Sequence, residues 1–179
     1  MRNECNKLHM KRNNLTILIA DDSEEDQMLL NRAIKVCAIS GVSTQTMSSG
    51  NEAIAYLLGI EPYNNRDQFP YPTFLLTDLK MPDGDGFKVL EYLKTNPQSA
   101  IVPTVILSSS ADSDDVKRAY SLGASAYLVK PVDSFALAAM IKNLIAFWMN
   151  CEVPEVDQAG AQLKTECLGK LGERFIADD

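Results

Sequence analysis

The 179-residue sequence has few of the features that mark secreted, membrane or zinc-binding proteins. Its four cysteines lie far apart with no C-x-x-C spacing, so we expect reduced thiols rather than disulfides. Cys5 and His9 could supply two zinc ligands, but nothing supplies the other two. The longest apolar run, 135–141, is too short to span a membrane, and the polar N-terminus lacks the apolar core of a signal peptide. These absences predict a cytoplasmic protein without a membrane partner.

Basic residues are also scarce, since 17 Lys and Arg stand against 24 Asp and Glu, for a net charge of −7. Nucleic-acid binding needs a basic surface, so we expect no nucleic-acid partner. The charge is unevenly distributed along the chain: the first 14 residues are net basic and the last 29 are net acidic. This division predicts a polar N-terminal tail (1–14), one globular domain (15–150) and an acidic C-terminal extension (151–179).

Apolar runs typical of buried strands alternate five times with segments that have helical spacing and capping residues. We expect strands at 16–20, 42–47, 73–77, 102–108 and 124–129, and helices beginning near residue 24 and covering 48–58, 86–95, 111–123 and 134–150. Short helical connections between apolar strands imply right-handed crossovers. The sequence therefore predicts an α/β fold, a doubly wound five-stranded parallel sheet with helices on both faces.

Two segments of this pattern are unusual. Residues 59–72 contain three prolines and are expected to form a loop. The helix at 134–150 is apolar nearly all round, which leaves hydrophobic surface after it packs on the sheet. We expect this helix to form a homodimer or kinase-docking face; the alternative is that the acidic C-terminal segment folds back over it.

Polar residues end four of the five expected strands, and parallel strands gather their carboxyl ends at one edge of the sheet. Asp21 and Asp22 follow the first strand, Asp78 the third, Ser108 ends the fourth, and Lys130 follows the fifth. Three carboxylates repel one another unless a cation joins them, and an all-oxygen ligand set suits Mg²⁺. An oxygen of Asp78 could then act as a nucleophile that forms an aspartyl phosphate, with Lys130 and Ser108 contacting the phosphoryl oxygens.

Each of these residues has an ordinary explanation when taken alone, because an Asp after a strand is most often a helix cap and a Lys-Pro is usually a turn. Other binding motifs fail. The DGDG stretch at 83–86 does not fit a calcium EF-hand, since its register puts Leu79 or Met81 at the first ligand position. No glycine-rich nucleotide loop follows any expected strand. The five residues indicate a phosphoryl-transfer site only when they are taken together.

That set resembles the receiver domain of two-component response regulators over about residues 15–150. The resemblance is carried by Asp21-Asp22, TDLKMPDGDG around Asp78, VILSSS around Ser108, and YLVKPVD around Lys130. It implies a flavodoxin-like sheet of order 2-1-3-4-5, with Asp78 as the phosphoacceptor. It also implies that Asp22 and Asp78 ligate Mg²⁺, assisted by Asp21 and by the backbone carbonyl of Lys80.

The resemblance further implies a switch formed by Ser108 and Tyr127, a phosphate-binding Lys130, and a cis peptide between Lys130 and Pro131. The side chains of Lys80 and Ser110 would partly set the rate of self-dephosphorylation. Such a protein is a phosphoacceptor rather than a conventional enzyme. Ser at position 108 replaces the commoner Thr and keeps the hydroxyl.

The longer 59–72 segment is similar to that of stand-alone receivers serving bacteriophytochrome-type kinases, so we expect a sensor histidine kinase as partner. No DNA-binding domain is expected in the 29 residues after Asn150, and output would be protein–protein contact or onward phosphotransfer. Two alternatives stay open. One is a receiver-like scaffold that is never phosphorylated. The other is a metal-dependent phosphohydrolase. Its chemistry requires a second acid, acting as general acid two residues after the nucleophile, where this chain has Lys80.

Overall fold

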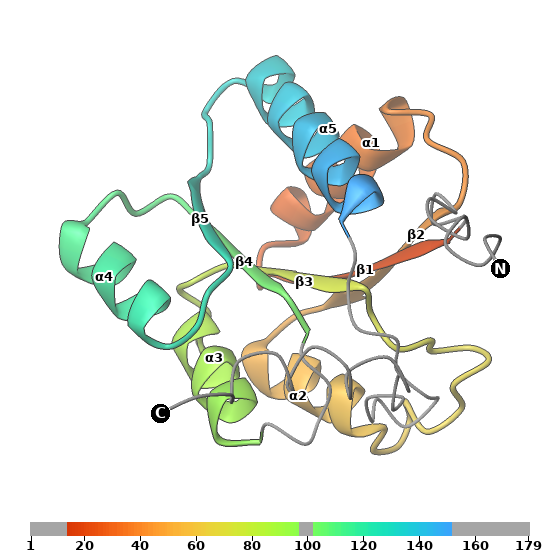
Figure 1. Ribbon diagram of the computed structural model, residues 1–179, viewed down its shortest axis with the longest axis vertical. Helices are drawn as coiled ribbons and strands as arrows, with labels where there is room; N and C mark the ends of the chain where they lie inside the picture. The colour runs from red at the N-terminus through yellow and green to blue at the C-terminus, as the bar shows by residue number, and fades with distance from the viewer. Residues whose placement is uncertain (1–13, 97–101, 152–179) are drawn as a thin grey trace, which may run out of the picture.

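The computed structural model describes residues 14–96 and 102–151, and within them a five-stranded parallel sheet forms the centre of the fold (Figure 1). The strands are β1 (Leu15–Ala20), β2 (Val42–Met47), β3 (Phe74–Thr77), β4 (Thr104–Ser108) and β5 (Ala126–Val129). Their order is β2-β1-β3-β4-β5, and every neighbouring pair is parallel. The fold class and strand order expected from the sequence are confirmed.

Helices cover both faces of the sheet, with α1 and α5 above it and α2 and α3 below it in the view of Figure 1. Their bounds are α1 (Glu24–Val36), α2 (Gly50–Leu58), α3 (Gly86–Thr95), α4 (Ser113–Ser121) and α5 (Ser134–Asn150). The domain boundaries at 14 and 151 stay predictions. The expected N-terminal tail and C-terminal extension lie almost wholly outside the described residues.

The helices begin where polar side chains satisfy free backbone N–H groups of the first turn. Ser23, Ser49, Asp85, Asp112 and Asp133 are the N-caps of α1 to α5, and each side chain accepts a hydrogen bond from a backbone N–H in the helix. These caps fix where each helix starts after its strand. As a result, the strand-end residues are held in short turns at one edge of the sheet.

Alternating side chains of the strands fill a separate hydrophobic core on each face of the sheet. Ile17 and Ile19 of β1 face α1 and α5. Leu18 of β1 and Leu75 of β3 face α2 and α3, while Ile106 of β4 packs with α3 and α4. All five side chains are essentially inaccessible to water. The sheet is therefore a rigid support for the residues that follow its strands.

The 59–72 segment is a loop, as expected, and it is fastened to the end of α2 by one arginine. Arg66 donates from Nη1 to the carbonyl of Tyr56 at 2.9 Å and from Nη2 to the carbonyl of Leu57 at 2.9 Å. These carbonyls belong to the last turn of α2, where backbone C=O groups have no N–H partner within the helix. The Tyr56 hydroxyl donates to the carbonyl of Pro70 at 2.6 Å and closes the other end of the loop. The segment thus packs against α2 rather than extending away from the domain.

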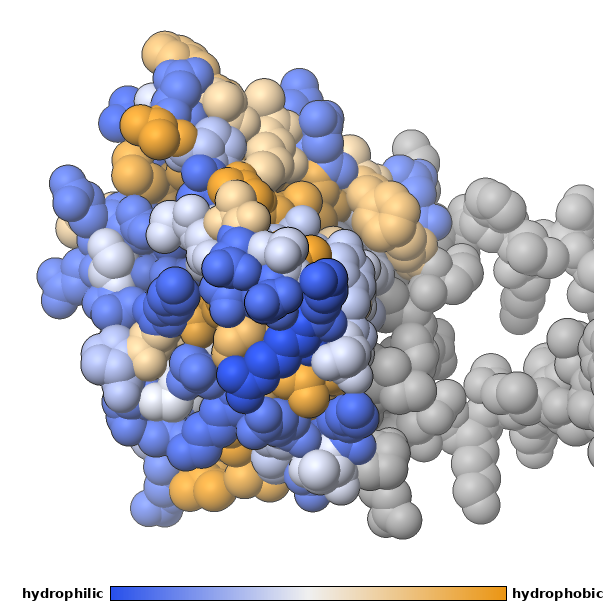
Figure 2. All heavy atoms as spheres, turned by 90° about the vertical axis from the view of Figure 1, so that its left-hand side faces the viewer, coloured by the Kyte–Doolittle hydropathy of each residue, from blue (hydrophilic) through white to orange (hydrophobic). Residues whose placement is uncertain are grey.

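Helix α5 buries one face against the sheet and leaves large apolar side chains outside. Its buried residues are Leu137, Ile141, Ile145 and Trp148. Phe135 is 84% exposed and Phe147 is 60% exposed, and Val132 just before the helix is fully exposed. Figure 2 shows hydrophobic surface on the upper part of the side that carries α4 and β5, above a mostly hydrophilic centre. No helix within the described ranges is long and apolar enough to cross a membrane.

Candidate functional site

Asp21 and Asp78 lie side by side because the strands before them are paired. Ala20 and Thr77, the last residues of β1 and β3, are partners in the parallel register. The backbone N–H of Asp78 donates to the carbonyl of Ala20 at 2.8 Å, which extends the pairing by one residue. Both carboxylates therefore leave the sheet at the same edge, as the sequence predicts.

Asp22 joins these two residues, and carboxylate oxygens of Asp21, Asp22 and Asp78 all lie within 4.8 Å of one another. Asp21 is 1% exposed, while Asp22 is exposed and Asp78 is partly buried. Hard divalent cations prefer clustered carboxylate oxygens at an accessible edge. The described residues therefore fit the Mg²⁺ expected from the sequence. The contribution of the Lys80 carbonyl stays a prediction.

Lys130 brings a positive charge into this cluster from the end of β5. Its Nζ donates to Asp21 Oδ2 at 2.7 Å and to Asp78 Oδ2 at 3.1 Å. The backbone N–H of Lys130 donates to the carbonyl of Ser108 at 2.8 Å, which ties the end of β5 to the end of β4. The structure thus places the predicted lysine against the predicted phosphoacceptor.

Asp26 is a fourth carboxylate of the site that the sequence analysis missed. It lies in the first turn of α1, and Lys130 Nζ donates to its Oδ2 at 2.8 Å. Its backbone N–H donates to the hydroxyl of the N-cap Ser23 at 3.2 Å, which fixes the start of the helix. The available signal was its position, because Asp26 comes three residues after the expected cap and therefore falls in the first turn of the helix, near the same edge of the sheet.

Burial, hydrogen bonds and charge in this cluster shift the pKa values of two groups. The pKa of Asp21 is raised above its ordinary value of 3.8, because burial outweighs the hydrogen bonds that Lys130 and the backbone of Ser23 donate to it. Burial alone would lower the pKa of Lys130. Its hydrogen bonds to Asp21 and Asp26 and the charge of Asp78 outweigh that effect and raise the pKa above 10.5. Lys130 is therefore a permanent cation, whereas the charge of Asp21 opposes folding.

We expect Asp21→Asn to stabilise the metal-free protein at neutral pH by on the order of 1 kcal/mol, because the amide has no charge to desolvate. The folded-state pKa of Asp21 lies above the unfolded value of 3.8, so its contribution to stability is complete below that pH. It is lost as the pH rises through the folded-state pKa. Urea unfolding in EDTA across this acidic range and up to neutral pH measures the effect. A wild type more stable than the variant at neutral pH would contradict it. Asp67→Asn, at an exposed position of the 59–72 loop away from the cluster, is the control.

The predicted switch residues lie next to this cluster. Ser108 is 1% exposed and its hydroxyl accepts a hydrogen bond from the N–H of Ser110 at 3.3 Å. The Tyr127 hydroxyl donates to the carbonyl of Ser110 at 3.0 Å, so the tyrosine and the serine contact the same turn. The Ser110 hydroxyl donates to Asp115 of α4 at 2.8 Å, and Lys80 Nζ lies 3.9 Å from the same oxygen of Asp115. The turn after β4 thus connects the site to α4.

One prediction for the site is wrong. The Lys130–Pro131 peptide is not cis; among the described residues the cis peptide is Glu61–Pro62 in the loop after α2. The trans form is the intrinsically favoured state of an X–Pro bond. Here the trans peptide already allows Lys130 to pair with Ser108 through its backbone and with the carboxylates through its side chain. Nothing in the lysine's contacts requires the rarer isomer.

The glycines after Asp78 allow the close backbone approach that the sequence suggests. A Cβ on Gly86 would lie 2.5 Å from the carbonyl oxygen of Asp78, and Gly84 has a φ of +78°. The N–H of Gly50 donates to the carbonyl of Gly84 at 2.8 Å, which binds the turn to the start of α2. Any larger residue at 86 would displace the backbone of Asp78.

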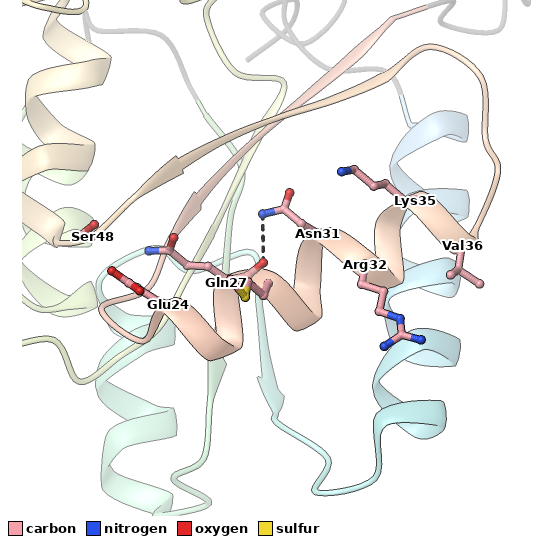
Figure 3. A pocket seen from close by; sticks show the side chains of 8 residues that line it. Glu24, Gln27, Asn31, Arg32, Lys35, Val36 and Ser48 are labelled. Carbon is pink, nitrogen blue, oxygen red and sulfur yellow. Dashed lines mark hydrogen bonds between the residues drawn. The ribbon is translucent and has the colours of Figure 1, made fainter.

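A surface pocket lies along α1 (Figure 3). It is lined by Glu24, Gln27, Met28, Asn31, Arg32, Lys35, Val36 and Ser48. Apart from Ser48, these residues come from α1, and Asn31 donates to the carbonyl of Gln27 within the helix. No residue predicted for the site lines this pocket, although its Gln27 donates from the side-chain amide to the backbone carbonyl of Asp21 at 2.5 Å.

A parallel sheet of this order, with an acidic cluster and a lysine gathered at its carboxyl edge, defines the receiver class of signalling domains. Residues 17–142 match the family described as the response regulator receiver domain. The chain therefore belongs to the response regulator receiver family, which confirms the resemblance in the sequence.

Several response regulators are similar to this chain over most of their own length. Response regulator Rcp1 of Synechocystis sp. is 32% identical over 133 residues, which cover 74% of this chain and 88% of the relative. A solved response regulator in red light signalling of R. palustris is 32% identical with a TM-score of 0.74, covering 79% of this chain and 99% of that one. The solved structure of the phosphorylated cyanobacterial phytochrome response regulator RcpA is 30% identical with a TM-score of 0.72, and the Mn²⁺-bound form of Rcp1 is 30% identical with a TM-score of 0.70. Each match covers 79% of this chain and 99% of the other chain.

Proposed function

We propose that this protein is a phosphorylation-controlled signalling switch of a two-component phosphorelay, with Asp78 as its phosphoacceptor. The observation that carries the proposal is the meeting of the Asp78 carboxylate with two further carboxylates and the Lys130 ammonium at one edge of the sheet. Membership of the receiver family supports it. The protein is a phosphoacceptor rather than a conventional enzyme.

The contacts of Asp78 suit nucleophilic attack on phosphorus. Its Oδ1 accepts the N–H of Leu79 at 2.6 Å and its Oδ2 accepts from Lys130, so both oxygens are held in place. A carboxylate oxygen forms the bond to phosphorus, the bond from phosphorus to the donor's leaving atom breaks, and that electron pair leaves with the donor. Lys130 contacts an oxygen of the transferred group and stabilises its charge.

Mg²⁺ bound by Asp21, Asp22 and Asp78 would neutralise charge on the incoming phosphoryl group. The ligand set is entirely oxygen, and the exposed Asp22 leaves the edge open to solvent. The similarity to Rcp1, which has been solved with Mn²⁺, supports a divalent ion at this position. The backbone carbonyl of Lys80 would complete the protein's ligands.

The phosphoryl donor in this proposal is a sensor histidine kinase of the bacteriophytochrome type, acting in the cytoplasm. Support comes from the relatives, since RcpA is named as a phytochrome response regulator and the R. palustris protein as part of red light signalling. A further similar structure is named as a bacteriophytochrome response regulator, at 32% identity and a TM-score of 0.59. The output is protein–protein contact.

Phosphorylation adds nearly two negative charges at Asp78, and Ser108 and Tyr127 transmit this change to the surface. Ser108 moves toward the phosphoryl group, and Tyr127 follows because both contact the Ser110 turn. The self-dephosphorylation rate depends on Lys80 and Ser110, whose side chains both approach Asp115.

We expect Ser108→Ala to leave phosphorylation of Asp78 largely intact and to reduce the phosphorylation-dependent gain in partner affinity by about tenfold, as for the loss of one hydrogen bond to a charged group. The measurement is partner binding with and without acetyl phosphate. Ser121→Ala on α4 is the matched control, since its hydroxyl donates to the carbonyl of Arg118 in its own helix. An unchanged gain in Ser108→Ala would remove this residue from the switch.

A homodimer through α5 is part of the same proposal. Phe135, Phe147 and the preceding Val132 leave apolar surface exposed where a second copy could cover it. The expected result is a dimer in light scattering of the chain ending at Asn150, and weakening of that dimer by Phe135→Asp. A soluble monomer without exposed apolar surface would contradict it. The alternative, burial by the C-terminal segment, falls on residues outside the described ranges.

Two other functions are less well supported. A permanent scaffold has no use for three clustered carboxylates, one of which is buried at a cost to folding. A phosphohydrolase would need an acid in place of Lys80, whose side chain is 71% exposed. The deciding experiment is intact-protein mass after incubation with acetyl phosphate and Mg²⁺. One phosphoryl adduct that is lost with EDTA supports the switch, and no adduct with any divalent ion favours the scaffold.

A further inference from the structure

The Lys130 ammonium has three N–H donors, and the structure supplies three carboxylate acceptors for them. The partners are Asp21 at 2.7 Å, Asp26 at 2.8 Å and Asp78 at 3.1 Å. The lysine side chain is only 14% exposed, so water has little access to the ammonium. A phosphoryl oxygen can therefore reach Lys130 only when one of these hydrogen bonds gives way.

Two of the three acceptors have other roles in the proposed function, on which this inference rests. Asp21 and Asp78 belong to the group whose oxygens could hold a divalent ion, whereas Asp26 lies outside that group. Phosphorylation also converts the Asp78 carboxylate into an acyl phosphate, which is a weaker acceptor because its negative charge moves onto the phosphoryl oxygens. Asp26 is the partner of Lys130 that neither event alters.

We infer that Asp26 is a positioning residue that holds the Lys130 ammonium in place during phosphorylation. Meanwhile the N–H of Lys130 that donates to the Asp78 carboxylate changes its acceptor to an oxygen of the phosphoryl group. The Asp26 carboxylate also balances the charge of Lys130, so that a divalent cation can bind beside the ammonium with less repulsion. Asp26 is well placed for this because Ser23 fixes the first turn of α1. Its side chain is 38% exposed, so its own charge is only partly desolvated.

The test compares Asp26→Asn with wild type, and repeats the comparison in a Lys130→Met background. We expect Asp26→Asn to slow phosphorylation by acetyl phosphate about fivefold and to weaken Mg²⁺ binding, measured by calorimetry, about threefold. In the Lys130→Met background both effects shrink below about twofold, because the residue acts through the lysine. Glu25→Gln removes the same charge from the same exposed turn and is the control.

A readout without metal or phosphoryl donor completes the test. The double-mutant cycle of unfolding free energies in EDTA should show favourable coupling between Asp26 and Lys130. The inference is overturned if wild type and Asp26→Asn take up the phosphoryl group at the same rate, or if Asp26→Asn slows phosphorylation by the same factor in the Lys130→Met background as in the wild-type background. If wild type takes up no phosphoryl group, the proposed function fails as well, and the mass spectrum of wild type alone shows this.

Discussion

Asp78→Asn is expected to abolish the phosphoryl adduct that wild type forms with acetyl phosphate and Mg²⁺. The amide lacks the nucleophilic oxygen anion, and it also removes one of the three carboxylates of the ion site. The substitution is nearly isosteric, and the amide oxygen of Asn can still accept the hydrogen bond of Leu79, whereas its NH₂ group cannot accept the one from Lys130. Lys130 keeps Asp21 and Asp26 as acceptors, so the fold should remain. Intact-protein mass measures the loss directly, and unfolding in urea verifies that the variant is folded.

The control for this variant is Asp114→Asn, which removes a carboxylate whose side chain is 89% exposed on α4. It should be phosphorylated at the wild-type rate. Hydroxylamine adds a second criterion, because it cleaves acyl phosphates and leaves phosphoserine intact. An adduct that persists in Asp78→Asn and resists hydroxylamine would move the modified position to a hydroxyl such as Ser108, and the proposed function would fall.

The fold could be predicted from the sequence because local signals and tertiary packing agree. Helices α3 and α5 have the predicted bounds, since N-caps and apolar spacing mark both of them. The start of β4 was placed two residues early, at 102 instead of Thr104. Pro103 explains the difference: it has no N–H to donate, although its carbonyl still accepts from Leu75 of β3.

Most of the candidate site was also predictable, because strand order decides which residues meet. Asp21 and Asp78 meet through the pairing of β1 with β3, which belongs to the strand order that the receiver resemblance implied. The alternation of strands and helices alone leaves that order open. Asp26 was missed because its partner Lys130 lies 104 residues further along the chain. No local pattern shows that a long side chain from the edge strand reaches the first turn of α1. The isomer of the Lys130–Pro131 peptide has no local signal either.

Lys130→Met is expected to lower the free energy of unfolding in metal-free buffer by about 3 kcal/mol, because it leaves a buried carboxylate without its cation. Asp21 is 1% exposed and would remain beside Asp26 and Asp78 with no positive charge among them. Urea unfolding in EDTA measures this effect. Lys88→Met, at an exposed position of α3, is the control and should change stability little.

Adding Mg²⁺ should restore the unfolding free energy that Lys130→Met loses in metal-free buffer. A divalent ion can take over the charge neutralisation that Lys130 supplies, and without the ammonium it meets less repulsion. We therefore expect Lys130→Met to bind Mg²⁺ more tightly than wild type and to gain more stability from it, since ligand binding stabilises in proportion to the logarithm of concentration over Kd. Equal gains in both proteins would show that lysine and metal do not share these carboxylates. Unequal gains would mean that metal binding loosens Lys130 and leaves its ammonium available to the phosphoryl group.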